Sequence, residues 1–119
     1  MSLEPRLQQM LHELADLGVE HIVVGGAAAI LQGAPILTGD LDLVHRRTPE
    51  NVGRLVPWLL SHDAYNRADL ANRRLRPKEE WLLGRGHILL QTDLGKLDLL
   101  CELAEGEGYE EIQIGRAHV

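Results

Sequence analysis

Two aspartates two residues apart are the part of this sequence best suited to chemistry. Asp40 and Asp42 interrupt a segment, 40–44, whose other residues are typical of a β-strand. Side chains two apart in a strand point to the same side, about 6.5–7 Å from each other along the chain. Two carboxylates this close repel each other unless cations or solvent compensate, and hard oxygen ligands suit Mg²⁺. The pair therefore predicts a site for Mg²⁺ or Mn²⁺. By the same alternation His45 falls on the opposite face, outside the site.

A glycine pair precedes this segment and suggests contact with phosphate. Gly25 and Gly26 follow a short β-branched apolar run and precede a helix-prone stretch, 27–32. Bare backbone can approach a ligand closely, and free N–H groups at the start of a helix favour an anion. A glycine turn after a strand is usually only a turn, so the pair alone is a weak signal. The sequence lacks the glycine motifs of Rossmann and P-loop nucleotide-binding domains.

A third acid stands in a distant apolar segment. Asp98 lies within the segment 97–100, whose remaining three residues are all leucine. A buried, unpaired carboxylate would be unfavourable there, so the residue either has a partner or faces water from an edge strand. The sequence leaves both readings open.

The elements that must position these residues alternate between helix and strand. Apolar residues at steps of three and four predict a helix over 3–17 that ends at Gly18. Thr48-Pro49-Glu50 predicts the start of a helix that runs towards His62, with a kink at Pro57. Segment 66–80 reads as irregular or helical surface, and Asp93-Leu94-Gly95-Lys96 as a hairpin turn with glycine at the positive-φ position. The fold class is α/β, with strands expected at 20–24, 40–45, 88–92 and 97–103.

Length and composition indicate one domain. The chain has 119 residues, of which 45% are hydrophobic and 25% charged, as in ordinary globular proteins. No apolar run approaches the ~20 residues of a membrane span, and no signal peptide is recognisable, so we expect a cytoplasmic protein with no membrane partner. The six histidines lack the spacing of zinc ligands, and the lone Cys101, among leucines, reads as a packed thiol.

A net charge of −6 argues against a surface that coats nucleic acid generally. A local basic cluster remains, and it could reach the phosphates of an acceptor or of a triphosphate, because guanidinium groups match phosphate oxygens. Charge runs are usually solvated surface instead, and both readings stay open. The cluster comprises Arg73, Arg74, Arg76 and Lys78.

The last six residues, 114–119, resemble the translation of a common sequencing adapter. We therefore expect a core domain over 1–113, a non-native tail over 114–119, and a natural chain that continues past Gln113. The alternative is a genuine short tail.

Taken together, these motifs resemble the DNA polymerase beta-like nucleotidyltransferase superfamily. The family pattern is a strand ending in Gly-Gly or Gly-Ser, a helix, a strand with acids between hydrophobic residues, and a third acid on a later strand. Here Val23-Val24-Gly25-Gly26 is followed after thirteen residues by Asp40-Leu41-Asp42, and later by Asp98. The resemblance covers residues 10–112 and is greatest to small bacterial nucleotidyltransferases, including those of toxin–antitoxin and abortive-infection systems.

The resemblance implies a nucleotidyltransferase-like mixed sheet flanked by helices and truncated at the C-terminus. It makes Gly25 and Gly26 the turn that contacts the triphosphate, with Thr38 also in the nucleotide site. Asp40 and Asp42 become ligands of the divalent metals, and Asp98 the third acid, which binds the first ion or takes the acceptor's proton.

The implied activity transfers a nucleoside monophosphate from an NTP, such as ATP, to a hydroxyl on RNA, protein or a small molecule. A toxin or antitoxin is an implied partner. The chain departs from the family in two ways. Ile36 and Leu37 stand where relatives often carry an arginine, and the usual C-terminal helices are missing.

Two other classes of function remain. The chain could be a non-catalytic binding module that keeps the fold as the partner of a toxin or another subunit, or a plain structural domain. Three acids on apolar strands argue against both, because a site without chemistry has no reason to keep costly charges.

Overall fold

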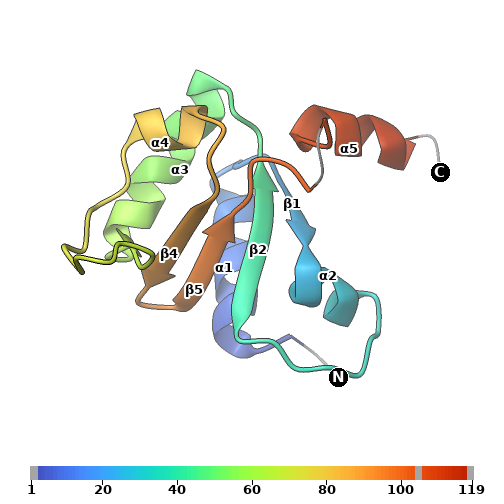
Figure 1. The fold of residues 1–119 in the computed structure, drawn as a ribbon. Coiled ribbons are helices and arrows are strands. Elements are labelled where there is room, and N and C mark those ends of the chain that lie inside the picture. Colours follow the sequence, from blue (N-terminus) through green and yellow to red (C-terminus); the bar gives the residue numbers. More distant parts are fainter. Residues whose placement is uncertain (1–2, 104–105, 118–119) are drawn as a thin grey trace.

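A five-stranded mixed sheet with helices on both faces forms the molecule (Figure 1). The computed structural model describes residues 3–103 and 106–117. This architecture confirms the predicted α/β class, and no helix among the described residues could cross a membrane. The strands are β1 (His21–Val24), β2 (Asp40–His45), β3 (Tyr65–Asn66), β4 (Ile88–Thr92) and β5 (Gly95–Leu99). The helices are α1 (Pro5–Asp16), α2 (Gly25–Leu31), α3 (Pro49–Ser61), α4 (Glu79–Leu83) and α5 (Tyr109–Ala117).

The strand order is β1-β2-β5-β4-β3. β2 lies between β1, with which it pairs antiparallel, and β5, with which it pairs parallel. β4 and β5 form the predicted hairpin, and β3 adds a short antiparallel edge to β4. The acid-bearing strand is therefore central, with a neighbour on each side.

One face of the sheet is covered by α1 and α3. Thr48 accepts a hydrogen bond from the amide of Asn51, and Pro49 occupies the first turn, as predicted for the start of α3. Pro57 lies inside α3, which continues through it. The main core joins these two helices to alternate residues of the central strands, among them Leu41, Leu43, Leu97 and Leu99, all fully buried.

The opposite face is covered at one end by α5. Ile22, Val24 and Val44 form a second apolar cluster, against which Tyr109 and Ile112 pack. The helix runs from Tyr109 to Ala117 and so crosses the boundary expected at 113. The remainder of this face carries the acids.

Some elements differ from the sequence prediction. β5 spans Gly95–Leu99 rather than 97–103, because Gly95, at φ +125°, already pairs with Thr92 and leaves a two-residue turn. β3 and α5 were not predicted, and α4 begins at the end of the stretch 66–80, expected to be irregular or helical surface, and continues to Leu83. β3 is too short for an alternating pattern to mark it.

Candidate active site

Asp42 and Asp98 face each other across the β2–β5 pair. They are register partners in parallel strands, so their side chains lie on the same face of the sheet. Asp40, two residues before Asp42, shares that face, and its register partner on β5 is the exposed Lys96. The three acids are each partly exposed, whereas the leucines between them are fully buried on the other face. We call Asp40, Asp42 and Asp98 the acid cluster.

The acid cluster is electrostatically crowded at its centre. Burial raises the pKa of Asp42, and the negative charges of Asp98 and Asp40 and a hydrogen bond with Asp98 raise it further. The positive charge of Arg67 acts in the opposite direction. Two adjacent carboxyl groups in this arrangement require a shared proton or a cation between them.

The glycine turn lies directly against the acid cluster. Gly25 has φ +68°, and a Cβ atom built on it would stand 2.4 Å from Oδ2 of Asp42. A Cβ on Gly26 would stand 3.2 Å from Oγ1 of Thr38. The positive φ favours glycine at Gly25, and a Cβ there would force the Asp42 carboxylate to move, so the turn and the acids lie against each other.

Thr38 fixes the entry to β2. Its hydroxyl accepts a hydrogen bond from the amide of Asp40 and lies 3.2 Å from the carbonyl oxygen of the same residue. The structure thus places Gly25, Gly26 and Thr38 beside the acids. The residue before α2, Val24, provides no side-chain hydrogen bond to the first amide groups of the helix.

Arg67 is a site residue that the sequence did not single out. Its Nη1 lies 2.5 Å from Oδ1 of Asp98, a buried oxygen that has no hydrogen bond of regular geometry. The same nitrogen donates a hydrogen bond to the carbonyl oxygen of Leu90 at 2.7 Å. The contact with Asp98 is therefore an ion pair whose geometry is set by the backbone of β4.

The donor set of the acid cluster suits a hard divalent cation. All three groups are carboxylates, and the crowding at Asp42 is of the kind that a cation relieves. Within residues 3–103 and 106–117, no three acidic, histidine or cysteine side chains converge into a ready-made metal cage. Mg²⁺ does not require one, because it is usually held by one or two carboxylates together with waters and substrate phosphates.

Other titratable residues lie outside the site. His45 is buried on the opposite face, where its Nε2 lies 2.8 Å from the carbonyl oxygen of Leu82. Asp93, in the turn between β4 and β5, lies with its Oδ1 2.7 Å from Nδ1 of His62. Cys101 is buried, which agrees with a packed thiol.

The basic cluster is engaged by its own neighbours. Arg73 forms two side-chain hydrogen bonds with Asp69, each of 3.0 Å, and Arg74 lies over the ring of Tyr65. Arg76 donates to the carbonyl oxygen of Leu60 at 2.8 Å. None of these contacts involves the acid cluster.

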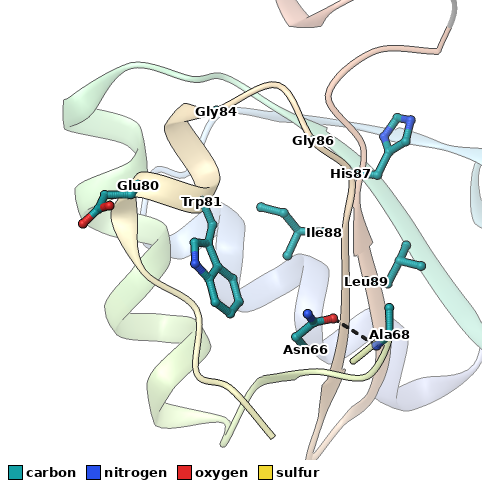
Figure 2. A pocket seen from close by; sticks show the side chains of 9 residues that line it. All are labelled: Asn66, Ala68, Glu80, Trp81, Gly84, Gly86, His87, Ile88 and Leu89. Carbon is teal, nitrogen blue, oxygen red and sulfur yellow. Dashed lines mark hydrogen bonds between the residues drawn. The ribbon is translucent and has the colours of Figure 1, made fainter. Parts of the chain in front are cut away.

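A pocket of about 450 Å³ lies at the start of β4, between the end of β3 and α4. Figure 2 shows Trp81 and Ile88 on one side of β4 and His87 and Leu89 on the other. Leu89 is the register partner of Asp98, so the pocket begins one strand away from the acid cluster. Its volume is within the range of small-molecule sites.

Comparison with protein-family models, curated proteins and solved structures gives no significant match to this chain. The geometry of the acid cluster and its surroundings is therefore the basis for assigning a function.

Proposed function

We propose that the chain is a metal-dependent nucleotidyltransferase that transfers a nucleoside monophosphate from an NTP to a hydroxyl acceptor. The observation that carries the proposal is the pairing of Asp42 with Asp98 in register on parallel strands, with the backbone of Gly25 packed against Asp42. This combination gathers oxygen ligands and an open backbone turn at one place on the sheet.

In the proposed reaction, the acceptor oxygen forms a bond to the α-phosphorus of the NTP, and the bond from that phosphorus to the leaving pyrophosphate breaks. Asp40 and Asp42 would hold Mg²⁺ or Mn²⁺, which activates the acceptor hydroxyl and neutralises charge on the triphosphate. Asp98 would bind the first ion or take the acceptor's proton. Gly25, Gly26 and Thr38 position the triphosphate.

We infer that the two substrates bind on separate sides of the acid cluster. The glycine turn follows β1, whereas Asp98 lies on β5, with the pocket along β4 beyond it. The NTP therefore occupies the β1 side and the acceptor the β4 side. Replacing Leu89, the register partner of Asp98 on the same face, by alanine should raise the KM for the acceptor and leave the KM for the NTP unchanged.

The reaction requires a supply of NTP, so the cytoplasm is part of the proposal. The test is transfer of label from α-phosphate-labelled NTPs to RNA, protein and small-molecule acceptors with Mg²⁺ or Mn²⁺, together with release of pyrophosphate. Asp40→Asn and Asp42→Asn should abolish both signals. Label transfer that persists in these variants would assign the activity to another site or a contaminant.

A non-catalytic binding module is the second candidate. The ion pair between Arg67 and Asp98 favours it, because it neutralises one of the acids without a metal. Such a module, acting as partner of a toxin or another subunit, should bind that protein equally well with Asp42→Asn. Absence of NTP binding with either metal would favour this reading over the enzyme.

A further inference from the structure

Arg67 reaches the acid cluster along a single row of the sheet. Tyr65 and Asn66 of β3 are opposite Gln91 and Leu90 of β4, so Arg67 follows opposite Leu89. Its amide donates to the carbonyl oxygen of Leu89 at 3.0 Å.

That row continues across the sheet. Leu89 pairs with Asp98, and Asp98 with Asp42. Arg67 and the two acids therefore belong to one transverse row, and the guanidinium must cross β4 to reach Asp98.

The ion pair is shielded from solvent and is held at its Arg67 end. The side chains of Arg67 and Asp98 are 23% and 15% exposed, so solvent screens them less than it screens the surface pairs. The hydrogen bond from Arg67 to the carbonyl oxygen of Leu90 holds the guanidinium in place. By contrast, Arg73 is 64% exposed in its pair with Asp69.

The charge of Arg67 acts where a metal ion would act. Of the ion pairs formed by the described residues, the one with Asp98 is the one that includes a member of the acid cluster. A guanidinium and a divalent ion cannot both occupy the same face of one carboxylate. Arg67 and the metal therefore compete for Asp98.

We propose that Arg67 is a resident counter-cation of the acid cluster, which holds Asp98 in the metal-free chain and gives it up when a divalent ion binds. This inference rests on the proposed function. It makes Arg67 a positioning residue that sets the affinity of the site for metal, so that metal alone binds weakly and nucleotide phosphates are needed to complete the exchange.

The first test is made without metal. Thermal unfolding in a chelator is measured for the wild type, Arg67→Gln, Asp98→Asn and the double variant. We expect Arg67→Gln to lower Tm in the wild type and to lower it less, or not at all, when Asp98 is already asparagine. An equal loss in both backgrounds would show that Arg67 stabilises the chain through other contacts and would overturn the inference.

The second test measures MgCl₂ binding by calorimetry. We expect Arg67→Gln to bind Mg²⁺ about fivefold more tightly than the wild type, the size of effect that an ion pair of this kind supports. Lys96→Gln removes a positive charge from the same face without breaking the pair, and should change the affinity less. Equal affinities of the wild type and Arg67→Gln for Mg²⁺ would rule out that the metal displaces Arg67 from Asp98. Equal gains in affinity in Arg67→Gln and Lys96→Gln would rule it out as well.

The outcomes separate the inference from the proposed function. If Mg²⁺ binds the wild type and Arg67→Gln with the same affinity, the metal does not displace Arg67 from Asp98, and the proposed metal site still stands. If no variant binds Mg²⁺ with or without NTP, the metal-dependent function fails, and exchange fails with it. Arg67→Lys keeps the charge but loses the forked geometry, so its affinity for Mg²⁺ should lie between those of the wild type and Arg67→Gln. This variant replaces Arg67→Gln in the test if the glutamine variant does not fold.

Discussion

Asp42 on β2 and Asp98 on β5 are register partners in a parallel pair, so two carboxyl groups from distant parts of the sequence meet on one face of the sheet. Burial and the charges of Asp98 and Asp40 raise the pKa of Asp42. The arrangement is unfavourable for folding without a cation, which is the usual sign of a site selected for binding rather than for stability.

Asp42→Asn should stabilise the metal-free chain. Because the pKa of Asp42 is raised above its usual 3.8 in the folded state, ionised Asp42 opposes folding, and stability is lost as pH rises through that raised pKa. The variant should therefore have a higher Tm than the wild type at pH 8 in a chelator, and nearly the same Tm at pH 3.

The same variant should lose affinity for NTP in the presence of Mg²⁺. Calorimetry with and without metal measures this loss, and Asp63→Asn, at an exposed turn, provides the control. Equal affinities of the wild type and Asp42→Asn for Mg–NTP would count against the metal site.

Gly25→Ala should destabilise the chain and remove nucleotide binding. Gly25 has φ +68°, and its Cβ would stand 2.4 Å from Oδ2 of Asp42. Gly18 has a similar φ of +72° with nothing within 4 Å of a Cβ, so Gly18→Ala isolates the backbone strain. We expect a loss of about 1–2 kcal/mol for Gly18→Ala and a larger one for Gly25→Ala, measured by urea unfolding. Equal losses would mean that Asp42 moves aside freely.

Stability should also depend on pH through His62. Its ring nitrogens lie 2.7 Å from carboxylate oxygens of Glu13 and Asp93, so both must carry protons. Burial alone would lower the pKa of His62, but these hydrogen bonds and charges raise it above 6.5. Hydrogen bonds from Gln9, Trp58 and His62 lower the pKa of Glu13 from 4.5 to about 2.

The signs of these shifts define a pH window. The contribution of His62 is complete below pH 6.5 and is lost as pH rises through its raised pKa. The contribution of Glu13 is complete above pH 4.5 and is lost as pH falls towards about 2. His62→Gln should cost about 0.5–1 kcal/mol near pH 5.5 and less at pH 9. A loss that is the same at both pH values would show that His62 acts through packing alone.

Patterns within single segments predicted the local parts of the site, whereas its assembly was predicted only through the resemblance. Alternation along one strand placed Asp40 and Asp42 on one face and His45 on the other, as observed. The pairing of β2 with β5 is non-local, and no pattern within either strand specifies which neighbour it will have. Only the resemblance, which made Asp98 the third acid, predicted its position with Asp40 and Asp42, and the structure confirms that the three share one face.

Arg67 was missed for a similar reason. It lay in a stretch read as irregular surface, and its reach depends on β3, a strand of only two residues. The available signal was weak: Tyr65 and Arg67 lie two apart and so share a face of any strand formed there. The basic cluster after it attracted attention through its density of charge, yet its three arginines contact residues outside the acid cluster.

The basic cluster provides the last prediction, on binding of RNA. Arg73 is held by Asp69, whose pKa its hydrogen bonds lower to about 2, and Arg74 lies 5.1 Å from the centre of the Tyr65 ring. Both cations already have intramolecular partners, and the net charge of −6 opposes approach of a polyanion. We therefore expect the slope of log K against log salt for tRNA binding to be the same in the wild type and in Arg73→Ala/Arg74→Ala. A slope that is shallower by about one unit for each lost phosphate contact would instead place these arginines at an RNA interface. That result would make RNA the acceptor to test first in the transfer reaction.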